Sequence, residues 1–219
     1  MLMRQRIKQY LPVYLVMGLS GNGKWTAAEM AKEALEGGIT LLQLREKDAP
    51  LHQVLEQGRQ IRDLCRKYHV PFIVNDRVDV ALLLDADGVH VGQDDIPGSD
   101  ARKLLGPSKI IGISAGTMEE AEYAVAQGAD YLGVGPIYAT ATKSDAGEPI
   151  GTNLMWQIQK RWSIPMVGIG GIGHDNAAQV IAAGGDGVAI VSAITKQAAP
   201  RSAASMLHQN VKAALSKRI

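Results

Sequence analysis

Eight short runs of apolar residues recur along the chain, and longer segments of mixed polarity separate them. Most positions within each run are apolar, which is typical of strands buried on both faces of a parallel sheet. The predicted strands are Val13–Met17, Thr40–Leu44, Phe72–Asn75, Gly88–Val91, Ile110–Ser114, Tyr131–Gly135, Pro165–Ile169 and Gly187–Val191. The pattern therefore predicts an α/β fold built around a buried parallel sheet.

The segments between these runs have the spacing of amphipathic helices. Apolar residues recur at intervals of three and four from Leu51 to Leu64 and again from Ala204 to Leu215. The segments EGGIT, DADGV, QGADY and AGGDG each precede a predicted strand, and glycine suits the left-handed residue that ends a helix. This recurring joint indicates a repeated βα unit. We therefore expect a closed (β/α)8 TIM barrel rather than an open doubly wound sheet, in a single catalytic domain over residues 1–219.

Composition limits the partners that the chain can bind. Among the 219 residues, 46% are apolar and 21% are charged, and the formal net charge is +1. Such a balance argues against nucleic acid and against an anionic membrane surface as partners. The one cysteine excludes an internal disulfide and a cysteine-cluster metal site. No run reaches the ~20 apolar residues of a membrane span, and MLMRQRIKQYL lacks the apolar run of a signal peptide, so we expect a cytoplasmic protein.

Polar residues gather just after the predicted strands, where TIM barrels carry their active sites. The opposite joints hold mostly glycine, alanine and aspartate. This asymmetry predicts an enzyme whose functional residues lie at the carboxyl end of the barrel. The candidates after the strands are Gln43, Leu44, Arg45, Glu46, Lys47, Asn75, Asp76, Asp95, Ser114, Thr140, Thr142, Lys143, Gly171 and Ser192.

Asp76 and Asp95 follow neighbouring strands, so their carboxylates can approach each other across the mouth of a barrel. Two carboxylates without cysteine or clustered histidine suit a hard cation, and Mg²⁺ commonly takes one or two carboxylates together with water and substrate phosphate. The residues predict a magnesium site here. A helix N-cap, with Asp76 capping the following helix, and an exposed salt bridge are the alternatives.

Phosphate binding is predicted at two places on the same rim. Arg45 and Lys47 share one strand end and would neutralise a diphosphate beside the metal, and Lys143 adds a cation on the longest loop, Pro136–Pro149. Gly168-Ile169-Gly170-Gly171 and Val191-Ser192 follow the seventh and eighth strands, which often bind phosphate in TIM barrels. An ordinary charged loop and a tight turn without a ligand are the alternatives.

Seven motifs in order resemble those of the thiamine-phosphate synthase family, over nearly the whole chain. They are QLREKD, FIVNDRVDVAL, ADGVHVGQDD, GISAGT, ADYLGVGPIYATATK, VGIGGI and GVAIVSAI. The family couples an aminopyrimidine methyl diphosphate to a thiazole phosphate, giving thiamine phosphate and diphosphate. The resemblance implies a magnesium-dependent transferase with these two small molecules as substrates. The sequence does not give the oligomeric state, and a homo-oligomer is compatible with it.

The resemblance also implies a role for each matching position. The pyrimidine diphosphate would be bound by Gln43, Leu44, Arg45, Glu46, Lys47, Asn75, Ser114 and Lys143. Asp76 and Asp95 would hold Mg²⁺. Thr140, Ala141 and Thr142 would border the thiazole phosphate, and Gly171, Val191 and Ser192 would bind its phosphate group. Arg45, Lys47, Ser114 and Lys143 are the expected catalytic residues.

Two positions depart from the family pattern. Family members often carry a histidine two residues after the serine of the fifth strand, where this chain has Gly116, and often a proline at the position of Ala139. A related thiazole tautomerase lacks much of the diphosphate apparatus, so QLREK and both aspartates favour the synthase. A sugar-phosphate isomerase or epimerase on the same barrel and a non-catalytic binder of thiamine precursors stay open as alternatives. None of the five histidines is assigned a catalytic role.

Overall fold

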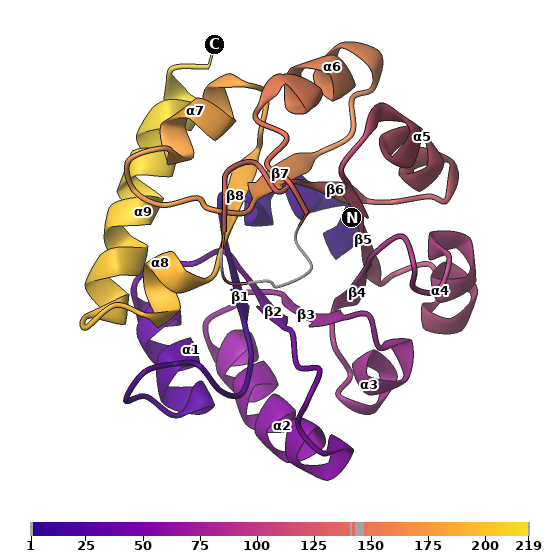
Figure 1. Cartoon of the computed structure of the whole chain (residues 1–219). Helices are drawn as coiled ribbons and strands as arrows, with labels where there is room; N and C mark the ends of the chain where they lie inside the picture. Colours follow the sequence, from indigo (N-terminus) through magenta and orange to yellow (C-terminus); the bar gives the residue numbers. More distant parts are fainter. Residues whose placement is uncertain (1, 141, 143–146, 219) are drawn as a thin grey trace.

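The eight strands of the computed structural model close into a parallel ring in which each strand pairs with its neighbours in sequence and β8 returns to β1 (Figure 1). The structure describes residues 2–140, 142 and 147–218. The strands are β1 Val13–Met17, β2 Leu41–Leu44, β3 Phe72–Asn75, β4 Gly88–Val91, β5 Ile110–Ala115, β6 Tyr131–Val134, β7 Met166–Ile169 and β8 Gly187–Ile190. The predicted TIM barrel is confirmed, with strand ends that differ from the predicted ones by at most one residue.

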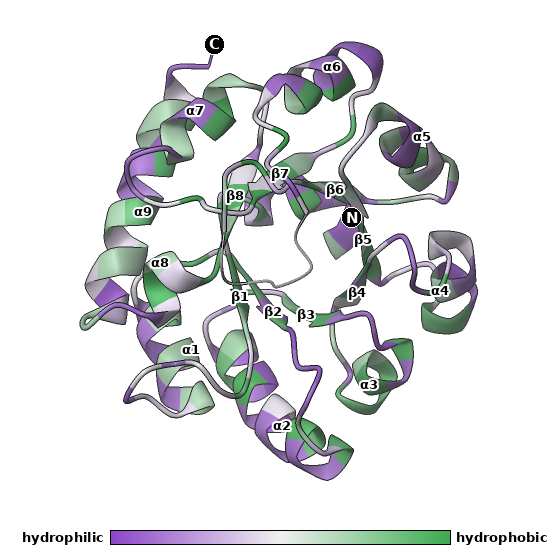
Figure 2. Cartoon of the chain, viewed as in Figure 1, coloured by the Kyte–Doolittle hydropathy of each residue, from purple (hydrophilic) through white to green (hydrophobic). Residues whose placement is uncertain are grey.

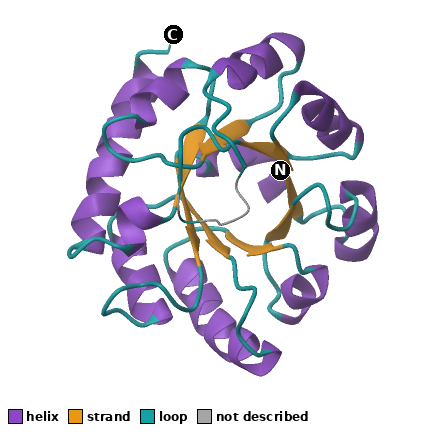
Figure 3. Cartoon of the chain, in the orientation of Figure 1, coloured by secondary structure: helices purple, strands orange, loops and turns teal. Residues whose placement is uncertain are grey.

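Helices surround the ring of strands, as Figure 3 shows. In the described residues they are α1 Ala27–Glu36, α2 Leu51–Lys67, α3 Val78–Leu83, α4 Gly98–Leu105, α5 Met118–Ala126, α6 Asn153–Arg161, α7 Ala177–Ala182, α8 Ser192–Thr195 and α9 Pro200–Ser216. None of the helices within the described ranges combines the length and apolar character needed to cross a membrane.

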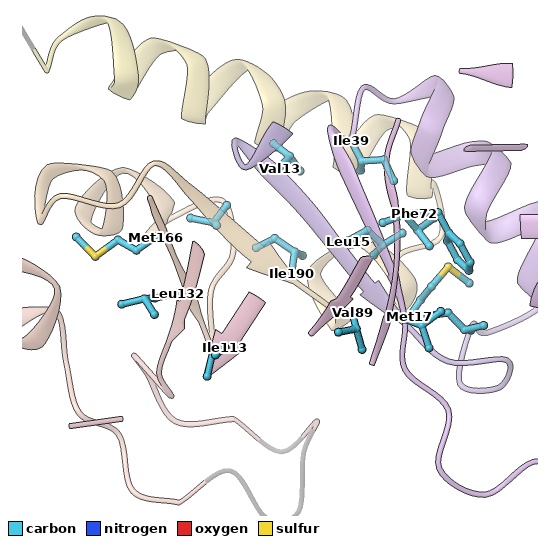
Figure 4. Packing of buried hydrophobic residues seen from close by; sticks show 14 of the residues in the cluster. Val13, Leu15, Met17, Ile39, Phe72, Val89, Ile113, Leu132, Met166 and Ile190 are labelled. Carbon is cyan, nitrogen blue, oxygen red and sulfur yellow. The ribbon is translucent and has the colours of Figure 1, made fainter. Parts of the chain in front are cut away.

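The core has two parts because successive side chains of a strand point to opposite faces of the sheet. The outer part lies between the strands and the helices and includes Leu15, Val89 and Leu132 (Figure 4). The apolar stripes of the helices turn toward it (Figure 2). The inner part fills the amino-terminal half of the barrel and includes Tyr14 and Tyr131. The carboxyl end of the barrel therefore stands above a packed floor.

The helix-to-strand joints share a hydrogen bond that the sequence pattern did not reveal. The residue just before each of the strands β2, β4, β6 and β8 accepts an N–H from the first or second residue of the preceding strand, at 2.8–3.1 Å; these acceptors are Thr40, Asp87, Asp130 and Asp186. Left-handed glycines end three of the four helices, at Gly38, Gly128 and Gly184. The fourth joint, DADGV, differs from the prediction that a left-handed glycine ends the helix.

In that joint, DADGV, Asp85 rather than a glycine takes the left-handed conformation, with φ of 47°. Gly88 is needed for space instead, because a Cβ atom there would lie 2.1 Å from the carbonyl oxygen of Ile110. Glycine is therefore needed at this joint for close packing of the strands and not for a left-handed conformation.

A 3₁₀ helix, η1 Met3–Tyr10, closes the amino end of the barrel and was not predicted (Figure 1). Ile7 is 2% exposed and packs in the inner core with Leu11 and Tyr14. Arg4 pairs with Asp130 at 3.2 Å, and Lys8 pairs with Asp186 at 3.1 Å. This closure leaves the carboxyl end as the open end of the barrel.

Candidate active site

A cavity of about 230 Å³ opens at the carboxyl end of the barrel. Its floor is Tyr14, and its apolar wall includes Val16, Val167, Ile169 and Ala189. The predicted site residues that line it are Gln43, Arg45, Asn75, Ser114, Thr140, Thr142, Gly171, Val191 and Ser192. Residues from six different strand ends thus meet in one space large enough for a small molecule.

The carboxyl groups of Asp76 and Asp95 interact directly, as their positions after neighbouring strands predicted. Burial, together with the hydrogen bond and negative charge of Asp95, raises the pKa of Asp76 to about 6 against the opposing charges of Lys47 and Arg45. Asp95 is held by the N–H of Gly92, which donates to Oδ2 at 2.7 Å. A proton shared by two such carboxylates marks a place that a cation can take.

The donor set fits a magnesium ion and does not fit a softer metal. Both ligands are carboxylates, and no cluster of three or more histidine, cysteine or acidic residues occurs in the parts of the chain that the structure describes. An ion at Asp76 and Asp95 would need water or substrate oxygens to complete its coordination, as Mg²⁺ commonly does. The capping alternative for Asp76 is wrong, because α3 begins after Arg77 and its cap makes no side-chain hydrogen bond.

Two cations lie beside this pair. Lys47 Nζ is 3.9 Å from Asp76 Oδ2, and the lysine side chain is half exposed. Arg45 lines the cavity and is anchored by its backbone N–H, which donates to the carbonyl of Met17 at 2.8 Å. Two positive charges therefore act on Asp76, and that of Arg45 lies at the cavity.

Glu46 and Leu44 hold the rim rather than face the cavity. Burial alone would raise the pKa of Glu46, but four backbone hydrogen bonds outweigh it and lower the pKa. The N–H donors, at 2.9–3.2 Å, belong to Leu19, Lys47, Asp48 and Ala49. Leu44 is 1% exposed and belongs to the outer core, so its side chain does not face the cavity.

The loops after β7 and β8 form the other side of the mouth. Gly170 and Gly171 are left-handed, with φ of 96° and 64°. Ser192 opens α8, and the first turn of a helix leaves backbone N–H groups without helical partners. Thr142 Oγ1 donates to Ser192 Oγ at 3.5 Å, which brings the loop after β6 onto this side. Ala141 and Lys143, which were also predicted, lie outside the described residues.

A buried polar group in the barrel was missed by sequence reasoning. His90, Tyr14 and Tyr131 point inward and make hydrogen bonds to one another and to Ser114, at 2.8–3.0 Å. A signal was available, because His90 stands between Val89 and Val91 in a strand whose alternate positions face opposite sides. Both faces of a barrel strand are buried, however, so the sequence alone did not show which face held the histidine.

Comparison with known proteins decides the family. Residues 13–194 match the family described as thiamine monophosphate synthase. The chain belongs to this family. It is 51% identical over 205 residues to the thiamine-phosphate synthase of Moorella thermoacetica, covering 94% of this chain and 98% of the relative. It is 49% identical to that of Geobacillus kaustophilus, with 95% of each chain covered.

A solved structure agrees with the sequence relatives. Thiamine phosphate pyrophosphorylase from Pyrococcus furiosus superposes with a TM-score of 0.87 at 40% identity, over 95% of this chain and 99% of that one. The predicted family and the predicted enzyme class, a transferase of thiamine biosynthesis that forms thiamine phosphate, are therefore confirmed. The roles of individual residues and the metal remain predictions.

Proposed function

We propose that the chain joins 4-amino-2-methyl-5-(diphosphooxymethyl)pyrimidine to a thiazole phosphate, with Mg²⁺ held by Asp76 and Asp95. One observation supports this most strongly. The interacting carboxylates of Asp76 and Asp95 lie within reach of the charges of Lys47 and Arg45, and Arg45 lines a cavity with apolar walls. Oxygen ligands and cations placed together suit a diphosphate, and an apolar cavity suits a flat ring.

The bond that breaks joins the pyrimidine methylene carbon to a diphosphate oxygen, and its electron pair leaves with that oxygen. Arg45 and Lys47 bind the departing diphosphate, and Lys143 is proposed to join them. Bound magnesium would neutralise the same oxygens as their charge grows. Charges that are already in position cost no reorganisation during the reaction, so this is the largest expected catalytic contribution.

The new bond forms when the thiazole nitrogen donates its lone pair to the methylene carbon. The electron-rich aminopyrimidine carries the positive charge until then, so the chain needs no nucleophile of its own. Gln43, Asn75 and Ser114 orient the pyrimidine, and Thr140, Thr142, Gly171, Val191 and Ser192 hold the thiazole phosphate; the predicted role of Ala141 is with this second group. The apolar wall limits access of water, which would otherwise trap the cation.

Mass spectrometry on the two purified substrates tests this proposal. With Mg²⁺ we expect thiamine phosphate and diphosphate in equal amounts, and with EDTA we expect neither. Equal product in EDTA would overturn the metal role. Binding of both substrates without product over a long incubation would instead support a non-catalytic precursor binder. Action in the cytoplasm, the absence of nucleic-acid and membrane partners, and any assembly into a homo-oligomer remain predictions beside this one.

A further inference from the structure

A continuous series of hydrogen bonds crosses the barrel beneath the cavity and ends at two of the proposed pyrimidine-binding residues. Gln43 Nε2 donates to Tyr14 Oη at 2.5 Å, and Tyr14 Oη lies 2.8 Å from Tyr131 Oη. Tyr131 Oη is 2.9 Å from His90 Nδ1, and His90 Nε2 is 3.0 Å from Ser114 Oγ. Gln43, Tyr14, His90 and Ser114 all line the cavity.

Two glycines make room for this series. A Cβ atom on Gly112 would lie 2.2 Å from Tyr131 Cζ and 2.5 Å from His90 Nδ1. A Cβ atom on Gly133 would lie 2.9 Å from His90 Cε1. The neighbouring strands β5 and β6 therefore carry glycine at the positions that face the histidine and the tyrosine. The side chains of the series come from β1, β2, β4, β5 and β6, so the arrangement does not rest on one flexible side chain.

The hydrogen bonds have one direction. Burial raises the pKa of Tyr14 and of Tyr131, so each phenol keeps its single hydrogen. Tyr14 accepts from the amide of Gln43, and Tyr131 is its other hydrogen-bond partner in the series, so we assign the hydrogen of Tyr14 to Tyr131. Tyr131 then donates to His90 Nδ1, which places the histidine hydrogen on Nε2, where it is donated to Ser114 Oγ. In the opposite order Tyr14 would accept both bonds, and its own hydrogen would have no acceptor among the residues of the series.

We infer that His90 is a positioning residue that, supported by Tyr131, holds the Ser114 hydroxyl as a hydrogen-bond donor toward an acceptor atom of the bound pyrimidine. Because Oγ accepts from His90, the hydrogen of Ser114 points to the cavity. This inference rests on the proposed role of Ser114 in binding the pyrimidine diphosphate. It predicts that removing the hydrogen bond between His90 and Ser114 weakens binding of the pyrimidine diphosphate and not of the thiazole phosphate.

Two amide replacements separate the two nitrogens of the ring. In His90→Gln the side-chain amide reaches the position of Nε2 and can still donate to Ser114. In His90→Asn the amide reaches only the position of Nδ1, so the bond to Ser114 is lost. We expect His90→Asn to lower kcat/KM for the pyrimidine diphosphate about tenfold, as for loss of one hydrogen bond, with KM for the thiazole phosphate unchanged. His90→Gln should recover most of that loss.

A double-mutant cycle distinguishes positioning from general damage to the fold. In a Ser114→Ala background, His90→Asn should cause no further loss, because its target is gone. An equal further loss, or wild-type kinetics for His90→Asn alone, would overturn the inference. Wild-type kinetics for Ser114→Ala would overturn the proposed role of the serine itself, so the two failures are distinguishable.

Control variants complete the experiment. His69→Asn changes an exposed histidine at the other end of the barrel, with φ of 56°, which asparagine tolerates, and it should leave all constants unchanged. If His90→Asn does not fold, Tyr131→Phe keeps the ring and removes the hydroxyl that donates to Nδ1 and accepts from Tyr14. We expect that variant also to weaken the pyrimidine diphosphate and not the thiazole phosphate, and equal weakening of both would contradict the inference.

Discussion

Replacing Asp76 with asparagine should stabilise the metal-free protein at neutral pH and abolish magnesium-dependent coupling. Asp76 has φ of 58°, a left-handed conformation that asparagine adopts as readily as aspartate. The asparagine amide can donate to the carboxylate of Asp95, so the contact between the two side chains survives. The change therefore removes one negative charge with little change of shape.

The magnitude follows from the pKa of Asp76, which burial and then Asp95 raise from 3.8 to about 6. A shift of about 2 units corresponds to ~3 kcal/mol at ~1.4 kcal/mol per unit. The side chain is 25% exposed, and solvent screening reduces the expected effect to about 1–2 kcal/mol. Because folding favours the protonated acid, this contribution is fully present below pH 3.8 and is lost as the pH rises through about 6.

Urea unfolding in EDTA at several pH values measures this difference. The wild type should lose about 1–2 kcal/mol of unfolding free energy relative to Asp76→Asn between pH 4 and pH 8. Asp76→Ala is the matched control, since it removes the same charge but adds roughly 1 kcal/mol of left-handed strain. The expectation would be refuted if Asp76→Asn were less stable than the wild type at pH 8 and the difference between the two proteins did not change with pH.

Three further changes test other parts of the account. Gly116→His should shift Tm by no more than about 3 °C, because the added Cβ would lie 3.4 Å from Glu120 Oε2, which is an ordinary contact. A much larger fall in the Tm measured by thermal unfolding would count against this. Gly171→Ala should raise KM for the thiazole phosphate about tenfold and leave KM for the pyrimidine diphosphate nearly unchanged. The added Cβ would lie 2.5 Å from the carbonyl oxygen of Ala139, at a residue whose φ is 64°. Equal effects on both KM values in steady-state assays would contradict this expectation. Ile7→Ala should cost roughly 2–4 kcal/mol in urea unfolding, because Ile7 is 2% exposed, and both KM values should be retained; a cost near zero would show that η1 does not close the barrel.

The strands were predictable because barrel strands are buried on both faces and read as continuous apolar runs. Thr40 was predicted as the first residue of a strand but stands just before it, since its hydroxyl accepts the N–H of Val13. Helix η1 was missed because it is short and is held by contacts with residues far along the chain, such as Asp130 and Asp186. The local pattern of apolar and polar residues does not indicate contacts between residues so far apart in the sequence.

The site was predictable where strand ends determine position, as for Asp76 and Asp95. It was not predictable where the direction of a side chain matters. Glu46 stands between Arg45 and Lys47 in sequence, yet its carboxylate accepts the backbone hydrogen bonds of two loops. His90 could be placed only once the barrel was closed, because Tyr131, its partner, is 41 residues away.

Asp76 and Asp95 are proposed to hold together a divalent ion that also binds diphosphate. Titration of Mn²⁺ followed by electron paramagnetic resonance, with and without inorganic diphosphate, tests it most directly. Diphosphate should tighten Mn²⁺ binding about tenfold or more in the wild type and in Asp94→Asn, which changes the exposed neighbouring aspartate. It should have no such effect in Asp95→Asn, whose amide oxygen can still accept from Gly92. Equal tightening in Asp95→Asn would contradict the account.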